Sequence, residues 1–207
     1  MSPPCMPYAE IQPLIRSGDL LLAQGNGPMS KMIQYATESP YSHVGFLLRL
    51  EALDRIMVLE SVESIGIRAA TLSGYVADYN GSGHPYPGRL MIARHQAVDL
   101  RQPEVFQTFS RTAIDLLGYP YDTQEIVEIT ARIVGAKLGM PPRPVRDNRT
   151  FICSEYCMAC FKSIGISIPY NRANFIAPGD FASCPEVDLL WEIGTDVDRR
   201  EPTPGYL

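Results

Sequence analysis

Long apolar runs are missing from this chain, and so is an excess of positive charge. No stretch approaches the ~20 uninterrupted apolar residues that a membrane-spanning helix needs, and the start, "MSPPCMPYAEIQPLIRSGD", has no basic segment followed by an apolar one. The net charge of -5 offers no electrostatic footprint for nucleic acid. We therefore expect no transmembrane segment, no nucleic-acid partner and a cytoplasmic location, with export by another route left open.

Histidine is also scarce, and the cysteines lack the pattern of a disulfide framework. The five cysteines are an odd number without the even spacing of a disulfide framework, which is typical of reduced thiols. Only three histidines are available as catalytic bases. The length of 207 residues predicts one domain spanning 1–207, and 45% hydrophobic and 20% charged residues are ordinary for a globular protein. The sequence does not indicate an oligomeric state.

Apolar patterning predicts a strand-rich first half and a helix-rich second half. Helical periodicity, proline starts and glycine or proline stops predict helices over 28–39, 103–118, 122–138 and 153–165. Short apolar runs bounded by turn residues predict strands over 19–25, 42–50, 55–62, 66–76 and 88–96, and the tail is expected to be a short strand or coil. Strands followed by helices indicate an α+β fold.

The segment "FICSEYCMAC" over 151–160 holds three cysteines spaced CxxxCxxC. This spacing also occurs in iron-sulfur enzymes of the radical S-adenosylmethionine type, but those carry it early in a long partial barrel, for which no chain is left here. As a helix, the segment places its apolar residues on one face, with Gly165 as the cap. These residues are Cys153, Cys157, Cys160, Phe161 and Ile164.

Within that helix only Cys153 is placed for chemistry. We predict that Cys157 and Cys160 are small buried core residues, as free cysteines commonly are. Cys153 opens the helix, where unpaired backbone N–H groups and the positive end of the helix dipole favour a thiolate. A buried structural role is the alternative for Cys153 as well.

A thiolate nucleophile needs a base, and His43 is the best candidate because it opens an apolar strand. His84 lies in a Gly/Pro-rich turn and His95 ends a strand, so both are weaker choices. Glu60 falls opposite or diagonal to His43 on the partner strand of the predicted hairpin and could orient the imidazole. Glu63 is the alternative if the register is shifted, and a solvent-facing Glu60 is the simpler interpretation.

The motifs "SGDLLL", "SPYSHVGFLL", "VLESVESIGIR", "GYPYDTQEI", "FICSEYCMACFKSIGI" and "APGDFAS" occur in this order over nearly the whole chain. They resemble the permuted, YiiX-like branch of the NlpC superfamily of papain-like cysteine hydrolases. The resemblance implies a circularly permuted papain-like (NlpC-type) α+β fold, with an antiparallel sheet packed against helices. It also implies that His43 matches the family's "SHvG" histidine, Glu60 its strand acid and Cys153 its "CSE" cysteine.

The function expected from these residues is a cysteine hydrolase that cleaves an amide (peptide or isopeptide) or ester bond through an acyl-enzyme. The backbone N–H of Cys153 and a side-chain donor would hold the oxyanion, with Tyr41 and Tyr121 as candidates that are otherwise packing residues. The resemblance implies a peptide or an acyl-lipid substrate. No metal or cofactor is expected.

Arginines precede the cysteine segment in "PPRPVRDNRT". Arg149, with Arg143 and Arg146, could receive a substrate carboxylate, and a solvated loop is the alternative.

Two other functions are also compatible with the sequence. An acyltransferase would use the same three residues, and a binding module would keep the fold without the chemistry.

Overall fold

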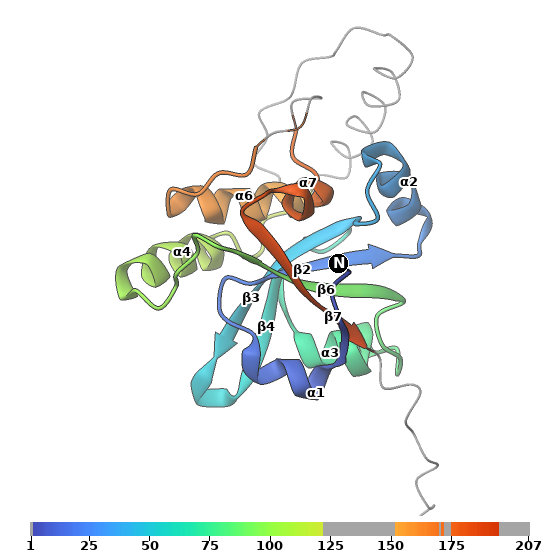
Figure 1. Cartoon of the computed structure of the whole chain (residues 1–207), viewed down its shortest axis with the longest axis horizontal. Coiled ribbons are helices and arrows are strands. Elements are labelled where there is room, and N and C mark those ends of the chain that lie inside the picture. Colours follow the sequence, from blue (N-terminus) through green and yellow to red (C-terminus); the bar gives the residue numbers. More distant parts are fainter. Residues whose placement is uncertain (1, 122–151, 170, 172–174, 195–207) are drawn as a thin grey trace, which may run out of the picture.

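The computed structural model describes residues 2–121, 152–169, 171 and 175–194. Within these ranges a seven-stranded sheet runs through the molecule in the order β1-β7-β6-β2-β3-β4-β5. Neighbouring strands are antiparallel except β1 and β7, which are parallel. Helices lie on both sides of this sheet (Figure 1). The predicted α+β class, an antiparallel sheet packed against helices, is confirmed.

Four of the strands, β2, β3, β4 and β6, fall close to the predicted apolar runs. Their bounds are β1 Cys5–Pro7, β2 Leu20–Gly25, β3 His43–Leu50, β4 Arg55–Val62, β5 Gly66–Thr71, β6 Gly88–His95 and β7 Val187–Gly194. The helices are α1 Tyr8–Ile11, α2 Pro28–Thr37, α3 Leu72–Ala77, α4 Pro103–Asp115, α6 Cys153–Ser163 and α7 Pro178–Ser183, with 3-10 turns at Gln12–Leu14, Glu51–Leu53 and Tyr79–Gly81. The helix predicted over 122–138 lies outside the described residues.

The sheet separates two hydrophobic cores, and this explains the unbroken apolar run of β2. Leu20 and Leu22 face the core shared with α4 and α6, whereas Leu21 and Ala23 face the core shared with α1 and α3. A strand buried on both faces has no polar alternation. None of the helices in the described part of the chain is long and apolar enough to cross a membrane.

One sequence prediction was wrong, and its correction bears on the site. The segment 66–76 was predicted as a single strand, but β5 ends at Thr71 and α3 follows at once. The side chain of Thr71 accepts a hydrogen bond of 3.1 Å from the N–H of Gly74, which caps the new helix. Tyr75 therefore projects from a helix and not from a strand.

The cysteine-bearing helix α6 agrees with its predicted pattern. Cys153 is its first residue, and Cys157, Cys160 and Phe161 are buried along it. Gly165 adopts a positive φ of 79° after the helix, the left-handed conformation that favours glycine at a helix C-terminus. The helix packs against β3 and β4, so its N-terminus is brought to the strands that carry His43 and Glu60.

Candidate active site

Three side chains from separate elements come together where β3 begins. His43 is the first residue of β3, Glu60 lies near the end of β4, and Cys153 opens α6. The side chain of His43 is 18% exposed, that of Glu60 is fully buried, and Cys153 is 4% exposed. The site is thus shielded from bulk water, with the imidazole as its most accessible group.

The contact between His43 and Glu60 follows from the hairpin register. Phe46 pairs with Leu59 across the β3–β4 ladder. Continuing this register puts Glu60 opposite Gly45 and diagonal to His43, with both side chains on one face. The distance between His43 Nε2 and Glu60 Oε2 is 2.6 Å.

Gly45 leaves the space in which this contact forms. A Cβ at position 45 would lie 3.0 Å from the carbonyl oxygen of Leu59 and 3.1 Å from the Cβ of Glu60. Both distances are tighter than ordinary contact, and one of the two atoms belongs to the backbone. A side chain here would therefore push β4 and Glu60 away from β3.

The Glu60 carboxylate is held from two further directions. Arg68, directly across the β4–β5 ladder, donates from Nε to Oε1 at 2.9 Å. The hydroxyl of Tyr75, on α3, donates to Oε2 at 2.5 Å. A buried carboxylate is stable as an anion only when it is paired and hydrogen bonded, and these contacts supply both conditions.

The same contacts shift the acid–base behaviour of the site. Burial opposes ionisation of Glu60, but the hydrogen bond and charge of His43, together with Tyr75 and Arg68, outweigh it and hold the pKa of Glu60 below its usual value. Burial likewise opposes charge on His43. Hydrogen bonds to Cys153 and Glu60 overcome that effect and raise the pKa of His43 to about 10. At neutral pH the imidazole is therefore protonated between two acidic partners.

The position of Cys153 completes the arrangement. Its side chain lies close enough to His43 to help raise the pKa of the imidazole. Because His43 Nε2 contacts Glu60, the ring nitrogen left for Cys153 is Nδ1. The N-cap residue Ile152 has no side-chain acceptor for the first amides of α6, and Glu155, in the first turn of the helix, accepts a hydrogen bond of 3.3 Å from the backbone N–H of Ile152.

Two neighbours anchor the first turn of α6. The Ser154 hydroxyl donates to the carbonyl of Ile176 at 2.8 Å, and the Tyr156 hydroxyl donates to the carbonyl of Ala113, on α4, at 2.9 Å. Both hydroxyls are buried. These bonds fix the first turn of α6, which carries Cys153, to α4 and to the segment before α7, as a preorganised site requires.

The other cysteines have different surroundings. Burial raises the pKa of Cys157 well above its usual value and that of Cys160 to about 12, so both are inert core thiols. Burial and the hydrogen bond to Glu186 raise the pKa of Cys184, and Cys5 is exposed. In the described ranges no group of three or more His, Cys, Asp or Glu could hold a metal ion.

The remaining polar candidates lie elsewhere. His84 is exposed in its turn, and Glu63 is exposed beyond the end of β4. His95, the last residue of β6, is buried, which lowers its pKa, and its ring lies 5.9 Å from that of Phe161. The structure therefore brings neither the alternative histidines nor the alternative acid to Cys153.

The residues expected to bind substrate lie in different surroundings, and some of them lie outside the described residues. The Tyr41 phenol lies within electrostatic reach of Arg89 and Glu192, and burial raises its pKa. Tyr121 packs in a small apolar cluster with Ile152, the residue before Cys153. Arg143, Arg146 and Arg149 lie outside the described residues.

Sequence reasoning missed Arg68, Tyr75 and Tyr86. Alternation along β5 could have placed Arg68 beside Glu60, whereas Tyr75 was hidden by the wrong strand prediction. Tyr86 lies within electrostatic reach of both Cys153 and Glu60, and burial raises its pKa. A Cβ on Gly25 would lie 2.8 Å from the Tyr86 hydroxyl, so this hydroxyl is at the end of β2 nearest His43.

The fold and the site define an α+β protein whose sheet carries a histidine and an acid beside a cysteine at a helix N-terminus. The fold is similar to that in the crystal structure of metalloprotein yiiX from Escherichia coli O157:H7. The TM-score is 0.60, the sequence identity is 18%, and the match covers 87% of this chain and 97% of that chain. At this identity the similarity concerns the fold alone. No protein-family model matches the sequence, and no curated protein matches it significantly.

Proposed function

We propose that this protein is a cysteine hydrolase of the permuted papain-like, NlpC type, with Cys153 as nucleophile, His43 as acid and base, and Glu60 as the orienting acid. The observation that carries the proposal is the distance of 2.6 Å between His43 Nε2 and Glu60 Oε2, with Cys153 close enough to His43 to help raise its pKa. A nucleophile bonded to a base that is oriented by a third group is the pattern of covalent acyl transfer. The substrate class is a peptide or isopeptide amide, or an acyl ester such as that of a lipid.

In the acylation step the Cys153 thiolate attacks the carbonyl carbon of the substrate and a tetrahedral intermediate forms. The protonated His43 gives its Nδ1 proton to the departing amine or alcohol as the bond to the carbonyl carbon breaks. The acyl group then remains on Cys153 as a thioester. Glu60 keeps its charge throughout and stabilises the imidazolium, since its pKa is held low.

Deacylation repeats these steps with water. Neutral His43 takes a proton from water as the oxygen attacks the thioester, and the Cys153 thiolate leaves beside the imidazolium that has formed. The acid product is released and the starting pair is restored. The backbone N–H of Cys153, in the first turn of α6, is one oxyanion donor. Tyr86 joins Tyr41 and Tyr121 as a candidate for the second donor, because it lies within electrostatic reach of Cys153.

The structural neighbour is described as a metalloprotein. Among the described residues of the present chain there is no group of three or more His, Cys, Asp or Glu that could hold a metal ion, and His43 Nε2 is bonded to Glu60. No step of the proposed reaction passes through a metal.

Incubation with an activated ester followed by intact-protein mass spectrometry tests the proposal. We expect one acyl group on Cys153 and release of free acid. Cys153→Ala should abolish acylation, and His43→Ala should slow turnover by about a hundredfold or more, because positioned acid–base catalysis contributes about that much. Cys5→Ala, which removes an exposed thiol, is the matched control and should behave as the unchanged protein. Acylation that survives Cys153→Ala would refute the proposal, and transfer to an added amine in place of water would indicate an acyltransferase.

A further inference from the structure

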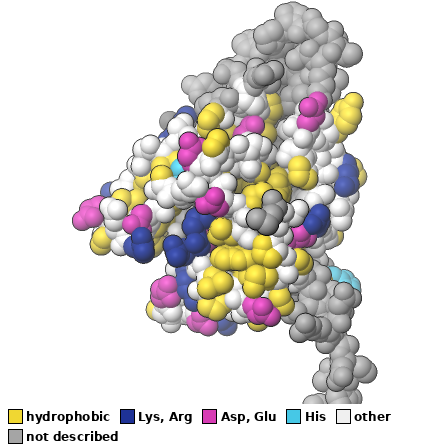
Figure 2. Space-filling model, viewed as in Figure 1, with side chains coloured by type: hydrophobic (Ala, Val, Ile, Leu, Met, Phe, Trp, Pro, Cys, Tyr) yellow, Lys and Arg dark blue, Asp and Glu magenta, His cyan; other side chains and the backbone are white. Residues whose placement is uncertain are grey.

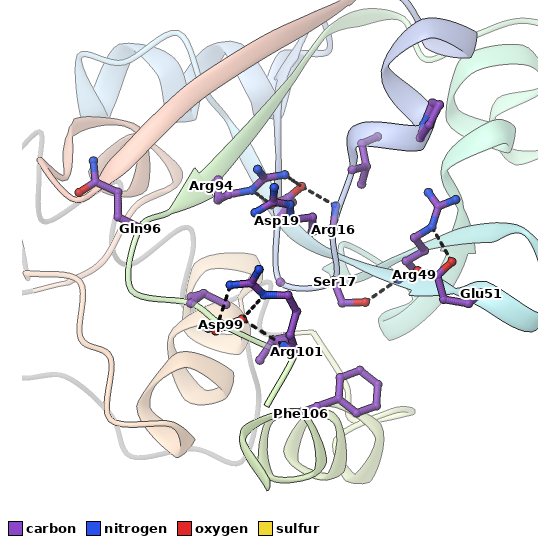
Figure 3. Close-up of a pocket in the computed structure, with 15 residues that line it drawn as sticks. Arg16, Ser17, Asp19, Arg49, Glu51, Arg94, Gln96, Asp99, Arg101 and Phe106 are labelled. Carbon is purple, nitrogen blue, oxygen red and sulfur yellow. Dashed lines mark hydrogen bonds and ion pairs between the residues drawn. The ribbon is translucent and has the colours of Figure 1, made fainter. Parts of the chain in front are cut away.

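A hollow lies at the opposite end of β3 from His43. It has a volume of about 770 Å³, within the usual range for small-molecule sites. Its walls come from the segment before β2, the end of β3, the end of β6 and the start of α4 (Figure 3). Arg49 on its rim is six residues along β3 from His43, which corresponds to about 20 Å. The hollow is thus separate from the candidate active site.

Arginine dominates the polar lining, through Arg16, Arg49, Arg94 and Arg101. Figure 2 shows dark blue side chains gathered in the same region, between α4 and α1. These four arginines outnumber the three acidic residues of the lining, Asp19, Glu51 and Asp99, by one. Arginine is also the residue best suited to forked contacts with carboxylate and phosphate groups.

Each acidic side chain in the lining is already paired with an arginine. Asp19 receives two hydrogen bonds from Arg94, at 2.6 and 2.8 Å, and Asp99 receives a bond of 2.7 Å from Arg101. Glu51 pairs with Arg49 at 3.1 Å. A cation entering the hollow would therefore find no free carboxylate among these lining residues.

Arg16 differs from the other three arginines. Its backbone N–H donates to Asp19 Oδ2 at 2.8 Å and its carbonyl accepts from the Asp19 N–H at 3.1 Å, whereas its exposed side chain forms no hydrogen bond or ion pair within the described residues. Its guanidinium is the charge in the lining that is left for a ligand. An exposed, unpaired arginine at the wall of a cavity favours an anion.

The hollow is preformed. Asp19 is buried and, through Arg94, ties the segment before β2 to β6. Gly18, with a φ of 90°, allows this segment to lie against Val98 and Leu100, because a Cβ there would come within 2.7 Å of Val98. Val98 and Leu100 provide an apolar wall beside the arginines.

We infer that this hollow binds a small molecule that carries a phosphate or carboxylate group, held by Arg16, and an apolar portion, packed on Val98 and Leu100. Phe106 of α4 also lines the hollow and extends the apolar wall. The inference does not rest on the proposed hydrolase activity. Ligand binding should persist in a Cys153→Ala variant, so failure of one proposal leaves the other standing.

Isothermal titration calorimetry with four probes tests the inference: hexyl phosphate, hexanoate, hexanol and inorganic phosphate. We expect saturable binding of hexyl phosphate, of hexanoate or of both, weaker binding of inorganic phosphate, and none of hexanol. Binding of only one of the two amphiphiles identifies the preferred anionic group. Amide NMR shifts on titration should concentrate at Ser17, Gly18 and Leu100.

The decisive variant is Arg16→Gln, with Arg111→Gln as the matched control. Arg111 is an exposed arginine of α4 that does not line the hollow, so both changes remove one positive charge from the surface. Arg16→Gln should weaken binding about tenfold, the effect of losing one charge-assisted hydrogen bond, at an unchanged unfolding temperature. Equal affinity in the two variants, binding of hexanol as tight as that of the anions, or no saturable binding at all would overturn the inference.

Discussion

Replacement of Glu60 by glutamine isolates the electrostatic part of the proposed mechanism. The change keeps the shape of a side chain that is fully buried and removes its charge. The hydrogen bonds from His43, at 2.6 Å, and from Tyr75, at 2.5 Å, both end on Oε2. An amide nitrogen at that position cannot accept either of them.

The size of the effect follows from the contacts. His43 would lose one of the two partners that raise its pKa to about 10, and its pKa should fall by one unit or more, with each unit equivalent to about 1.4 kcal/mol. Arg68, which is partly buried, would lose its charged partner. Breaking a buried pair on one side costs about 3–5 kcal/mol, so the free energy of unfolding should drop by roughly 3 kcal/mol.

NMR titration of the imidazole resonances is the assay, because three histidines give a spectrum simple enough to assign. In the unchanged protein His43 should titrate near pH 10 and His95 below its usual range, since burial lowers the pKa of His95. Glu63→Gln, a matched loss of charge at an exposed glutamate, should leave His43 unmoved. The reasoning fails if His43 titrates near 6.5 in the unchanged protein, or if the two glutamine variants give the same curve.

Further predictions concern packing, buried charge and pH. Gly45→Ala should lower the free energy of unfolding, measured in urea, by about 1–3 kcal/mol, because the new Cβ would meet Glu60 and the β4 backbone. Gly27→Ala, with nothing within 4 Å of its new Cβ, should lower it little. Equal urea midpoints for the two variants would contradict this prediction. Cys160→Asp should lower the melting temperature far more than Cys5→Asp, because only the first buries an unpaired charge, and similar melting temperatures would argue against a buried Cys160. Because the folded pKa of His43 is raised, its contribution to stability is complete below pH 6.5 and is lost as pH rises through about 10. The free energy of unfolding should therefore decline over that window, and a flat profile in denaturant titrations would show that His43 is not held as a cation.

The parts of the site that follow from local periodicity were predictable from the sequence. Period-two alternation in β3 and β4, together with a short loop, is enough to put Glu60 diagonal to His43. Helical spacing in α6 is enough to bury Cys157 and Cys160 and to leave Cys153 at the first turn. Each of these relations depends on residues close together in sequence.

The parts that depend on tertiary contacts were not predictable in the same way. Tyr75 reaches Glu60 only because Thr71 ends β5 and caps α3, a signal that the strand-like composition of 66–76 concealed. The arginine-lined hollow joins three segments that are far apart in sequence, 13–19, 49–51 and 94–106, and no spacing links them. Electrostatic terms such as the raised pKa of His43 likewise require burial and distances that only the folded chain defines.

Competition among the five cysteines tests the central claim most directly. If exposure alone controlled reactivity, Cys5 would react first, because it is exposed while Cys153 is 4% exposed. With limited iodoacetamide at about pH 6, where an unperturbed thiol is protonated, we expect Cys153 to be labelled first, and His43→Ala to slow that labelling several-fold. Peptide mapping by mass spectrometry measures both. First labelling of Cys5 or Cys184, or equal labelling of all five without dependence on His43, would contradict the assignment of Cys153 as the nucleophile.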